Sequence, residues 1–223
     1  MQYRGQIGKV AEGQIQIGGR IMFKKFAVVL GLIAGLSMLA VGAVDPGDKA
    51  PEFERFGVDY KYHSLEQYKD KEAVVVVFTC NHCPVAKSYE DKLISLAKEY
   101  QPKGIQFLAV NPNPADMVKA DGFPQMRQRA QEKGFPYPYL YDETQAVAKA
   151  YGAKVTPHIF VVQYREVEGK EKEVPYVVYE GSVDNRRKKP EYLANALDQI
   201  LAGEEIEKAK TAAFGCSVKY REK

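Results

Sequence analysis

The sequence predicts an α/β domain whose central mixed β-sheet is flanked by helices. Its clearest strand is the run Ala73–Phe78, in which four consecutive valines lack the polar alternation of a half-exposed strand, so both faces should be covered. Apolar runs and helical periodicity alternate along much of the chain. Two later apolar runs follow each other across a charged turn at Glu168–Lys172, which predicts an antiparallel hairpin. This order predicts a sheet with both parallel and antiparallel strands.

Each remaining element has its own local signal. A strand near residues 53–58 and a short polar helix opened by Ser64 come before the valine strand. A helix follows the valine strand, because residues 86, 89, 93, 96 and 100 are apolar at helical spacing and Gly104 lies just beyond them. The later elements are a strand at 105–110, a helix from Pro124 to Gly134, a short helix with an Asp142/Gln145 capping box and Gly152 as its stop, the hairpin, and a last helix at 190–201.

The first 43 residues differ from the rest of the chain. Lys24 and Lys25 precede an uncharged apolar run that ends in small residues, which is the pattern of a signal peptide with cleavage after Ala43. The run is also about long enough to cross a bilayer as an uncleaved anchor. We expect translation to begin at Met22. Three segments are therefore predicted: residues 1–43 as extension and signal peptide or membrane anchor, residues 44–203 as the folded domain, and residues 204–223 as a C-terminal tail that contains Cys216.

Composition and charge limit the classes of function. With 223 residues, 45% hydrophobic and 27% charged, the chain has the composition of one ordinary globular domain. Loss of residues 1–43 removes five basic residues and one acidic residue, so the formal net charge changes from +3 to −1, which argues against a nucleic-acid partner. The signal peptide predicts a periplasmic or secreted protein, attached to the membrane only if the segment is not cleaved.

The chemistry is expected at residues 79–84, which read TCNHCP. A structural zinc site usually needs four ligands, and the chain offers only Cys80, Cys83 and the distant Cys216. A structural disulfide across so small a loop would restrict the unfolded chain very little. Redox exchange by the Cys80/Cys83 pair is therefore the best explanation of the motif.

The position of the pair after a strand and before a helix predicts a stabilised thiolate. Unpaired N–H groups and the helix dipole should favour a negative sulfur on Cys80, and protonated His82 would add a nearby positive charge. We expect Cys80 to attack a substrate disulfide and Cys83 to resolve the mixed disulfide. The alternative for His82 is a solvent-exposed loop histidine without an electrostatic role.

Several segments resemble one known family: FTCNHCPVAKSYEDKL, NPNP, FPYPYLYDETQAVAKAYG, VTPHIFVV and GCSVKY are similar to the peroxiredoxin-like redoxins, relatives of the alkyl hydroperoxide reductases that carry a Cys-x-x-Cys motif. The resemblance covers roughly residues 45–201 and implies a thioredoxin-like fold with Pro157 as a cis-proline beside the redox pair. Thr156 would then offer backbone hydrogen bonds to an extended substrate peptide. Asn81 and Asn111 are further candidates for substrate contact, although Asn111 is as easily explained as a turn residue.

The resemblance also implies partners and leaves gaps. The partners would be protein thiols or disulfides and a redox donor protein, and no cofactor is needed beyond the disulfide itself. Thioredoxins usually have a buried acid in the strand before the cysteines, where this chain has only valines. The proton acceptor for Cys83 is therefore unassigned, with Glu90 as a candidate unless it simply faces solvent.

The sequence therefore predicts an exported thiol–disulfide oxidoreductase that acts on protein substrates through Cys80 and Cys83. A peroxiredoxin-like thiol peroxidase is the nearest alternative, although neither cysteine follows the Pro-x-x-x-Thr/Ser-x-x-Cys pattern of typical peroxiredoxins. A second alternative is a copper carrier that binds Cu(I) through both cysteines and His158. Cys216 is a third redox partner reaching back to the cleft, a site of intermolecular pairing, or an inert thiol.

Overall fold

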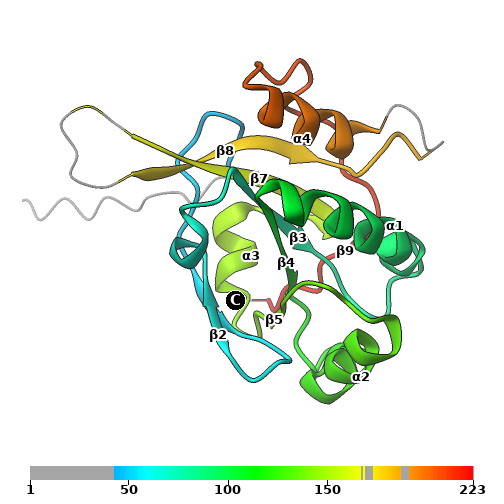
Figure 1. The fold of residues 1–223 in the computed structure, drawn as a ribbon. Coiled ribbons are helices and arrows are strands. Elements are labelled where there is room, and N and C mark those ends of the chain that lie inside the picture. The colour runs from blue at the N-terminus through cyan, green and yellow to red at the C-terminus, as the bar shows by residue number, and fades with distance from the viewer. Residues whose placement is uncertain (1–42, 167, 169–172, 187–190, 223) are drawn as a thin grey trace, which may run out of the picture. The chain divides into compact units, whose positions relative to one another are not determined.

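The computed structural model describes residues 43–166, 168, 173–186 and 191–222 (Figure 1). The described residues belong to one compact unit, Leu39–Lys223. The predicted signal segment, the Met22 start and most of the predicted turn at 168–172 lie outside the described residues. Within the part of the chain that is described, none of the helices has the length and apolarity needed to span a membrane.

The strands of the structure are β1 (Glu54–Phe56), β2 (Tyr62–Ser64), β3 (Ala73–Phe78), β4 (Ile105–Asn111), β5 (Tyr139–Tyr141), β6 (Val155–Thr156), β7 (His158–Arg165), β8 (Val174–Gly181) and β9 (Cys216–Ser217). The α-helices are α1 (Pro84–Tyr100), α2 (Phe123–Lys133), α3 (Ala146–Tyr151) and α4 (Tyr192–Ala202). Three short 3₁₀ turns are η1 (Glu66–Tyr68), η2 (Gln101–Lys103) and η3 (Lys119–Asp121). The predicted elements are found in the predicted order, with the short helix after Ser64 reduced to the 3₁₀ turn η1. The structure adds the strands β2, β5, β6 and β9 and the turns η2 and η3, which the sequence analysis did not predict.

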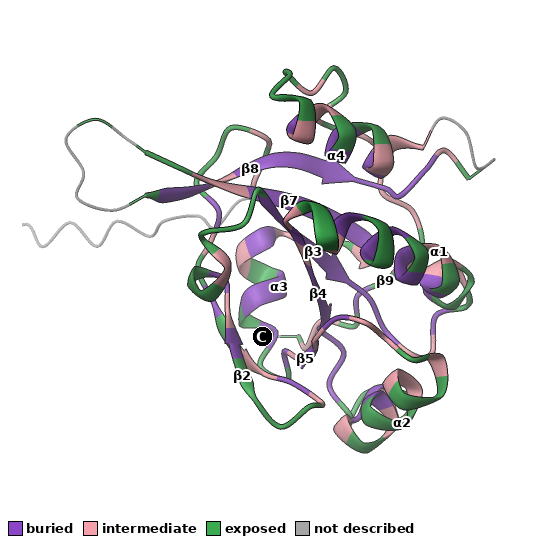
Figure 2. Ribbon diagram, viewed as in Figure 1, coloured by how far each residue is buried: buried purple, intermediate pink, exposed green. Residues whose placement is uncertain are grey.

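The central sheet has the strand order β5-β4-β3-β7-β8, so the valine strand β3 lies in its middle. It pairs in parallel with β4 and antiparallel with β7, which confirms the predicted mixed sheet. Every residue of β3 is buried, with side chains no more than 3% exposed. The strands of this sheet are mostly purple, that is buried, in Figure 2. Both faces of β3 are therefore covered, as the lack of polar alternation predicted.

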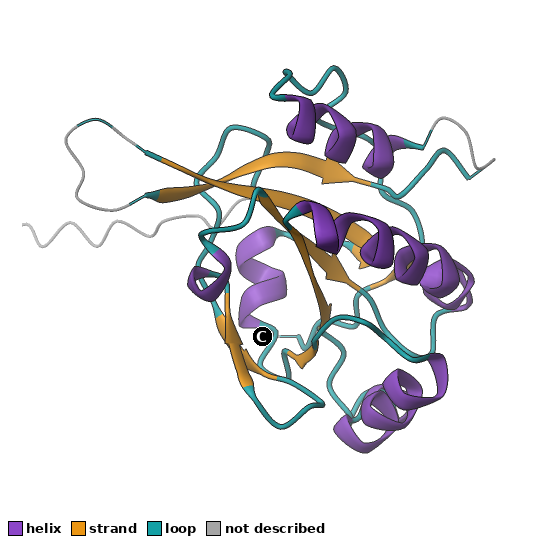
Figure 3. Cartoon of the chain, viewed as in Figure 1, coloured by secondary structure: helices purple, strands orange, loops and turns teal. Residues whose placement is uncertain are grey.

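Alternate residues of β3 belong to two different cores. Ala73, Val75 and Val77 pack with α1 and α4 on one face of the sheet. Val74, Val76 and Phe78 pack with α3 on the other face. Figure 3 shows these helices around the orange strands. Since burying one valine side chain stabilises the fold by about 1.5–3 kcal/mol, this strand is a major source of stability and a rigid support for the residues that follow it.

The start of α3 differs from the prediction. The expected capping box would have Asp142 cap a helix with Gln145 at its third position, but Gln145 itself is the N-cap, with a φ of 63°. The Asp142 carboxylate instead accepts a hydrogen bond from the Ala148 N–H at 2.8 Å, one turn further on. The Gln145 side chain donates to the backbone oxygens of Pro112 and Lys219, so it is used in tertiary contacts and is unavailable to a capping box.

The C-terminal tail, which the sequence could not place, returns to the edge of the domain where α1 begins. Its strand β9 pairs antiparallel with β6, with Cys216 opposite Thr156 and Ser217 opposite Val155. In Figure 1 the red end of the chain leads to β9 beside α1. The tail thus brings the third cysteine to the segment that precedes Pro157.

Candidate functional site

Cys80 and Cys83 lie between the end of β3 and the start of α1. Cys83 is the N-cap of α1, and its sulfur accepts a hydrogen bond from the Ala86 N–H at 3.4 Å. Pro84 occupies the first turn, where its missing N–H costs no hydrogen bond. All three cysteines of the chain are free thiols, and the side chains of Cys80 and Cys83 are buried. The two sulfurs therefore differ in their relation to the helix, since only Cys83 caps it.

Cys83 is the thiol whose ionised form is stabilised. Its thiol donates to the backbone oxygen of Thr156 at 3.2 Å, and Cys216 packs against the cluster that contains it. Burial opposes ionisation, but the hydrogen bonds from Cys216 and from the Ala86 N–H outweigh it, so the pKa of Cys83 lies below its ordinary value of 9.0. Cys83 is thus the better leaving group and the more readily formed thiolate of the pair.

Cys80 has the opposite character, which overturns the expectation of a stabilised thiolate there. Burial, followed by the negative charge of Asp121, raises the pKa of Cys80 from 9.0 to about 12. A hydrogen bond with the Thr156 hydroxyl, with 3.2 Å between Sγ and Oγ1, opposes this rise only in part. Cys80 is therefore a protonated thiol at neutral pH, and its thiolate is a poor leaving group.

Asp121 is the residue of this site that the sequence analysis missed. Its buried carboxylate accepts hydrogen bonds from the backbone N–H groups of Asn81 and His82, at 2.7 and 3.1 Å, and from the Asn113 amide at 2.9 Å. It also lies 2.5 Å from Nδ1 of His82. A positive charge on His82 is consequently paired with Asp121, so it does not act on the cysteines alone as the sequence analysis expected.

Cys80, His82 and Asp121 form one cluster. The Cys80 sulfur, a ring nitrogen of His82 and a carboxylate oxygen of Asp121 all lie within 4.8 Å of one another. The local signal for Asp121 was weak, because it is an ordinary loop aspartate in the sequence. Its position follows from the loop after β4, which ends at the same edge of the sheet as β3. The cluster is suited to moving a proton to or from Cys80.

Asn81 and Asn111 hold the loop that carries Asp121. The Asn81 amide donates to the backbone oxygen of Ala120 at 2.9 Å, and its oxygen accepts from the Tyr139 hydroxyl at 3.0 Å. Asn111 is fully buried and donates to the backbone oxygen of Asp121 at 2.9 Å. Both side chains therefore use their polar groups within the domain, which differs from the predicted contact with substrate.

The segment before Pro157 has the geometry that the resemblance implied, but it is not free. The Thr156–Pro157 peptide bond is cis. Thr156 is fully buried, and its backbone is paired with Cys216 of β9. The strand edge that the sequence analysis offered to a substrate peptide is therefore occupied by the chain's own tail.

Two other candidates lie outside the cysteine site. Glu90 accepts hydrogen bonds from the guanidinium of Arg129, at 2.9 Å from Nε, so it is a salt-bridged residue of α1 and α2 and not a base for the cysteines. His158 is 1% exposed and lies 3.0 Å from Glu180 through Nε2, while its Nδ1 accepts from the Lys154 N–H. Since both ring nitrogens are engaged away from the cysteines, the proposed copper ligand set is not assembled.

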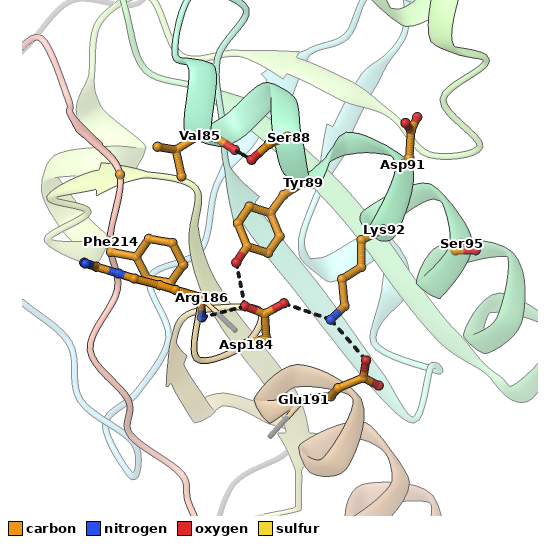
Figure 4. A pocket seen from close by; sticks show the side chains of 11 residues that line it. Val85, Ser88, Tyr89, Asp91, Lys92, Ser95, Asp184, Arg186, Glu191 and Phe214 are labelled. Carbon is orange, nitrogen blue, oxygen red and sulfur yellow. Dashed lines mark hydrogen bonds and ion pairs between the residues drawn. The ribbon is translucent and has the colours of Figure 1, made fainter. Parts of the chain in front are cut away.

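A groove of about 990 Å³ lies next to the cysteine site. In Figure 4, Tyr89 and Lys92 of α1 point toward Asp184, which accepts from the Tyr89 hydroxyl at 2.5 Å and from Lys92 Nζ at 2.9 Å. The rings of Phe214 and Tyr89 pack edge to face in the groove. The groove is also lined by Gly215, so it reaches the residue directly before Cys216.

The comparisons agree with this architecture. A model of the AhpC/TSA family matches residues 46–169. An uncharacterized conserved protein from Geobacillus kaustophilus is 37% identical, with 79% of this chain and 92% of that chain covered and a TM-score of 0.70. A hypothetical protein from Sinorhizobium meliloti 1021 is 26% identical, with 82% of this chain and 98% of that chain covered and a TM-score of 0.71. A putative thioredoxin from Neisseria meningitidis is 27% identical, with 72% of this chain and 95% of that chain covered and a TM-score of 0.52. No curated protein is significantly similar to the chain.

Proposed function

The chain belongs to the AhpC/TSA family, and from this membership and the geometry of its thiols we propose that it is a thiol–disulfide oxidoreductase acting on protein substrates through Cys80 and Cys83. Its fold is thioredoxin-like, as the sequence resemblance implied. The observation that carries the proposal is the asymmetry of the pair, with a low-pKa thiol at the helix N-cap and a high-pKa thiol beside a His–Asp pair.

The asymmetry assigns a role to each sulfur in the oxidising direction. A substrate thiolate attacks Cys80 of the Cys80–Cys83 disulfide, and Cys83 leaves as the thiolate because its pKa is the lower of the two. The second substrate thiolate then attacks the substrate sulfur of the mixed disulfide and releases Cys80. The substrate has become a disulfide, and the two enzyme sulfurs have taken up its electron pair.

Release of Cys80 requires a proton, because its thiolate is unstable in this site. The His82–Asp121 pair lies within 4.8 Å of the Cys80 sulfur and is placed to supply that proton, or to accept it when the reaction runs in reverse. This gives His82 the role of a proton carrier in place of the electrostatic role expected from the sequence. The sequence analysis considered Glu90 as a proton acceptor for Cys83, whereas the proposed proton transfer takes place at Cys80 and uses His82 and Asp121.

The location of the reaction outside the cytoplasm is part of the proposal. It is supported by the apolar segment after Lys24-Lys25, which has the signal-peptide pattern, and by a redox chemistry suited to an oxidising compartment. The expected partners are proteins with reactive thiols or disulfides. The putative thioredoxin from Neisseria meningitidis, at 27% identity, is consistent with this class of chemistry.

A thiol peroxidase is the second candidate, because the stabilised thiolate of Cys83 lies between two other thiols that could each condense with a sulfenic acid at this position. The two candidates are separated by one comparison with the purified protein. An oxidoreductase restores the disulfides of a reduced, denatured test protein in a glutathione buffer, and C83S abolishes this. Fast, stoichiometric consumption of hydrogen peroxide with slow disulfide transfer would instead assign the peroxidase function.

The reduction potential of the pair tests the proposal directly. Thiol alkylation and mass spectrometry across a glutathione redox series should show a Cys80–Cys83 disulfide with a potential nearer to about −120 to −180 mV than to about −270 mV, because a stabilised Cys83 thiolate favours the reduced state. The absence of this disulfide at every ratio of oxidised to reduced glutathione would refute the proposed function.

A further inference from the structure

Cys216 is held against Cys83 although 133 positions separate them in the sequence. Opposite Thr156 in the β6–β9 pair, Cys216 packs against the buried cluster formed by Cys80, Cys83 and Ala86. The two thiols also shift each other's pKa, downward for Cys83 and upward for Cys216. The Cys83 sulfur therefore has a second sulfur beside it besides that of Cys80.

The tail is anchored on both sides of Cys216, so this contact is built into the fold. Before it, the Thr211 hydroxyl accepts from the Ser182 N–H at 3.0 Å. After it, the Lys219 N–H donates to the Asn113 side chain at 2.9 Å, and Arg221 forms an ion pair with Asp116 at 2.7 Å. Several independent contacts hold the segment, and their combined effect positions the one cysteine between them.

Gly215 shows how close this approach is. A Cβ at position 215 would lie 1.9 Å from the backbone oxygen of Thr156, and the φ of 154° is one that other residues rarely adopt. A glycine is required there for β9 to reach β6. The position directly before the cysteine is thus shaped to bring the Cys216 sulfur to the cysteine pair.

We propose that Cys216 is a third catalytic thiol, which exchanges with the Cys80–Cys83 disulfide so that the chain's one disulfide moves to Cys83–Cys216. The inference rests on the proposed function, which supplies the starting disulfide. The Cys216 thiol releases its proton to solvent and its thiolate attacks the Cys83 sulfur. The Cys83–Cys80 bond breaks, and Cys80 leaves and takes up a proton from the His82–Asp121 pair, which regains a proton from solvent. One disulfide and one thiol are present before and after, so the step requires no further oxidant.

The burial of the three sulfurs explains what the exchange achieves. Cys80 is 2% exposed and Cys83 is fully buried, whereas Cys216 is half-buried. A substrate thiolate reaches Cys216 more easily than either member of the pair. Attack at Cys216 also expels Cys83, the sulfur with the lowered pKa, so the more accessible sulfur is attacked and the better leaving group departs. Cys216 thereby presents the buried disulfide to protein substrates.

The test uses the purified full chain and its C80S, C83S and C216S variants. Each is oxidised in a glutathione buffer, blocked by alkylation, digested with trypsin without reduction and analysed by mass spectrometry. Cys80 and Cys83 share the tryptic peptide 72–87, whereas Cys216 lies in 211–219, so the proposed disulfide joins two peptides and the Cys80–Cys83 disulfide joins none. We expect the joined peptides in the wild type, as the dominant oxidised form in C80S, and their loss in C83S and C216S.

Each other outcome has a distinct meaning. If the wild type forms the Cys80–Cys83 disulfide but C80S never joins the two peptides, Cys216 is not a redox thiol and the proposed function stands. If no variant or wild type forms either disulfide, the proposed function fails as well. Joined peptides that persist in C83S would assign the partner of Cys216 to Cys80 and overturn the exchange at Cys83.

A second variant keeps the test valid if C80S does not fold. In the otherwise wild-type chain, Gly215→Ala should displace β9 and abolish the joined peptides while leaving the Cys80–Cys83 disulfide. The matched control is Gly134→Ala, at a glycine that also has a positive φ but has open space around it. Joined peptides at the wild-type level in Gly215→Ala would overturn the proposal.

Discussion

Replacing Asp121 with asparagine tests the electrostatic origin of the asymmetry between the two cysteines. The substitution removes the negative charge that, after burial, is the second cause of the raised pKa of Cys80. It keeps an oxygen that can accept hydrogen bonds from the loop. We therefore expect the pKa of Cys80 to fall while the thiol remains buried.

The structure limits the size of this fall. With an effective dielectric constant of about 20, a unit charge at the outer limit of the cluster, 4.8 Å from the Cys80 sulfur, would change the energy of its thiolate by ~3 kcal/mol. A stricter limit comes from the rise of the Cys80 pKa from 9.0 to about 12, of which burial contributes the larger part. We therefore expect the loss of this charge to lower the pKa of Cys80 by an amount of the order of one pH unit, or ~1.4 kcal/mol.

The assay measures the alkylation rate of Cys80 against pH in a background without the other two cysteines. The rising limb of this profile follows the thiolate fraction, so Asp121→Asn should shift it toward lower pH by about one unit and raise the rate at a given pH about tenfold. The rate with excess reagent under denaturing conditions serves as the reference. Asp91→Asn is the matched control, because it removes the same charge from an exposed position on α1.

The expected direction can be refuted. An unchanged or raised alkylation pH profile in Asp121→Asn would show that the charge does not control Cys80, and the proposed proton relay would lose its basis. A rate increase that is equal at all pH values would instead report greater exposure of the thiol, and it would contradict the electrostatic explanation in the same way.

Three further predictions concern stability. Val76→Ala, at a fully buried position of β3, should lower the free energy of unfolding by about 2–3 kcal/mol in urea titrations, whereas Met117→Ala at an exposed site should change it by less than about 0.5 kcal/mol. In the reduced protein, the raised pKa of Cys80 favours the folded state below about pH 9, and this contribution is lost as the pH rises toward 12. Thermal melts between these pH values should therefore show a smaller loss of stability in C80S than in the wild type. Glu90→Gln should cost about 1–3 kcal/mol through its bond with Arg129 and leave the redox potential unchanged; a shifted potential would return Glu90 to the site.

The fold was predictable because its signals are local. The burial of β3 on both faces follows from its unbroken valines, and the start of α1 follows from the periodicity of its apolar residues and from Pro84. The same holds for the hairpin β7–β8. In each case the apolar residues of one short segment are enough to predict whether it is a strand of the sheet or a helix packed against the sheet.

The site was only partly predictable because its second half comes from distant segments. Asp121 lies on a 3₁₀ turn after β4 and reaches Cys80 only through the packing of the loop held by Asn111 and Asn113. Cys216 reaches Cys83 through a two-residue strand, which has no periodicity that a sequence could reveal. Neither contact leaves a local pattern, although together they determine which sulfur ionises.

The sequence analysis expected the stabilised thiolate on Cys80, but the structure stabilises it on Cys83, only three residues later. The stabilising effect of a helix N-terminus falls off within its first turn, so it depends on which residue is the N-cap. Because α1 begins at Pro84, Cys83 is the cap and receives the Ala86 N–H, while Cys80 lies three residues earlier, beside a carboxylate. The motif places two sulfurs near a helix, but the position of the cap decides which becomes the thiolate. The sulfur at the cap then leaves readily from either neighbour, and this makes exchange among three cysteines chemically reasonable.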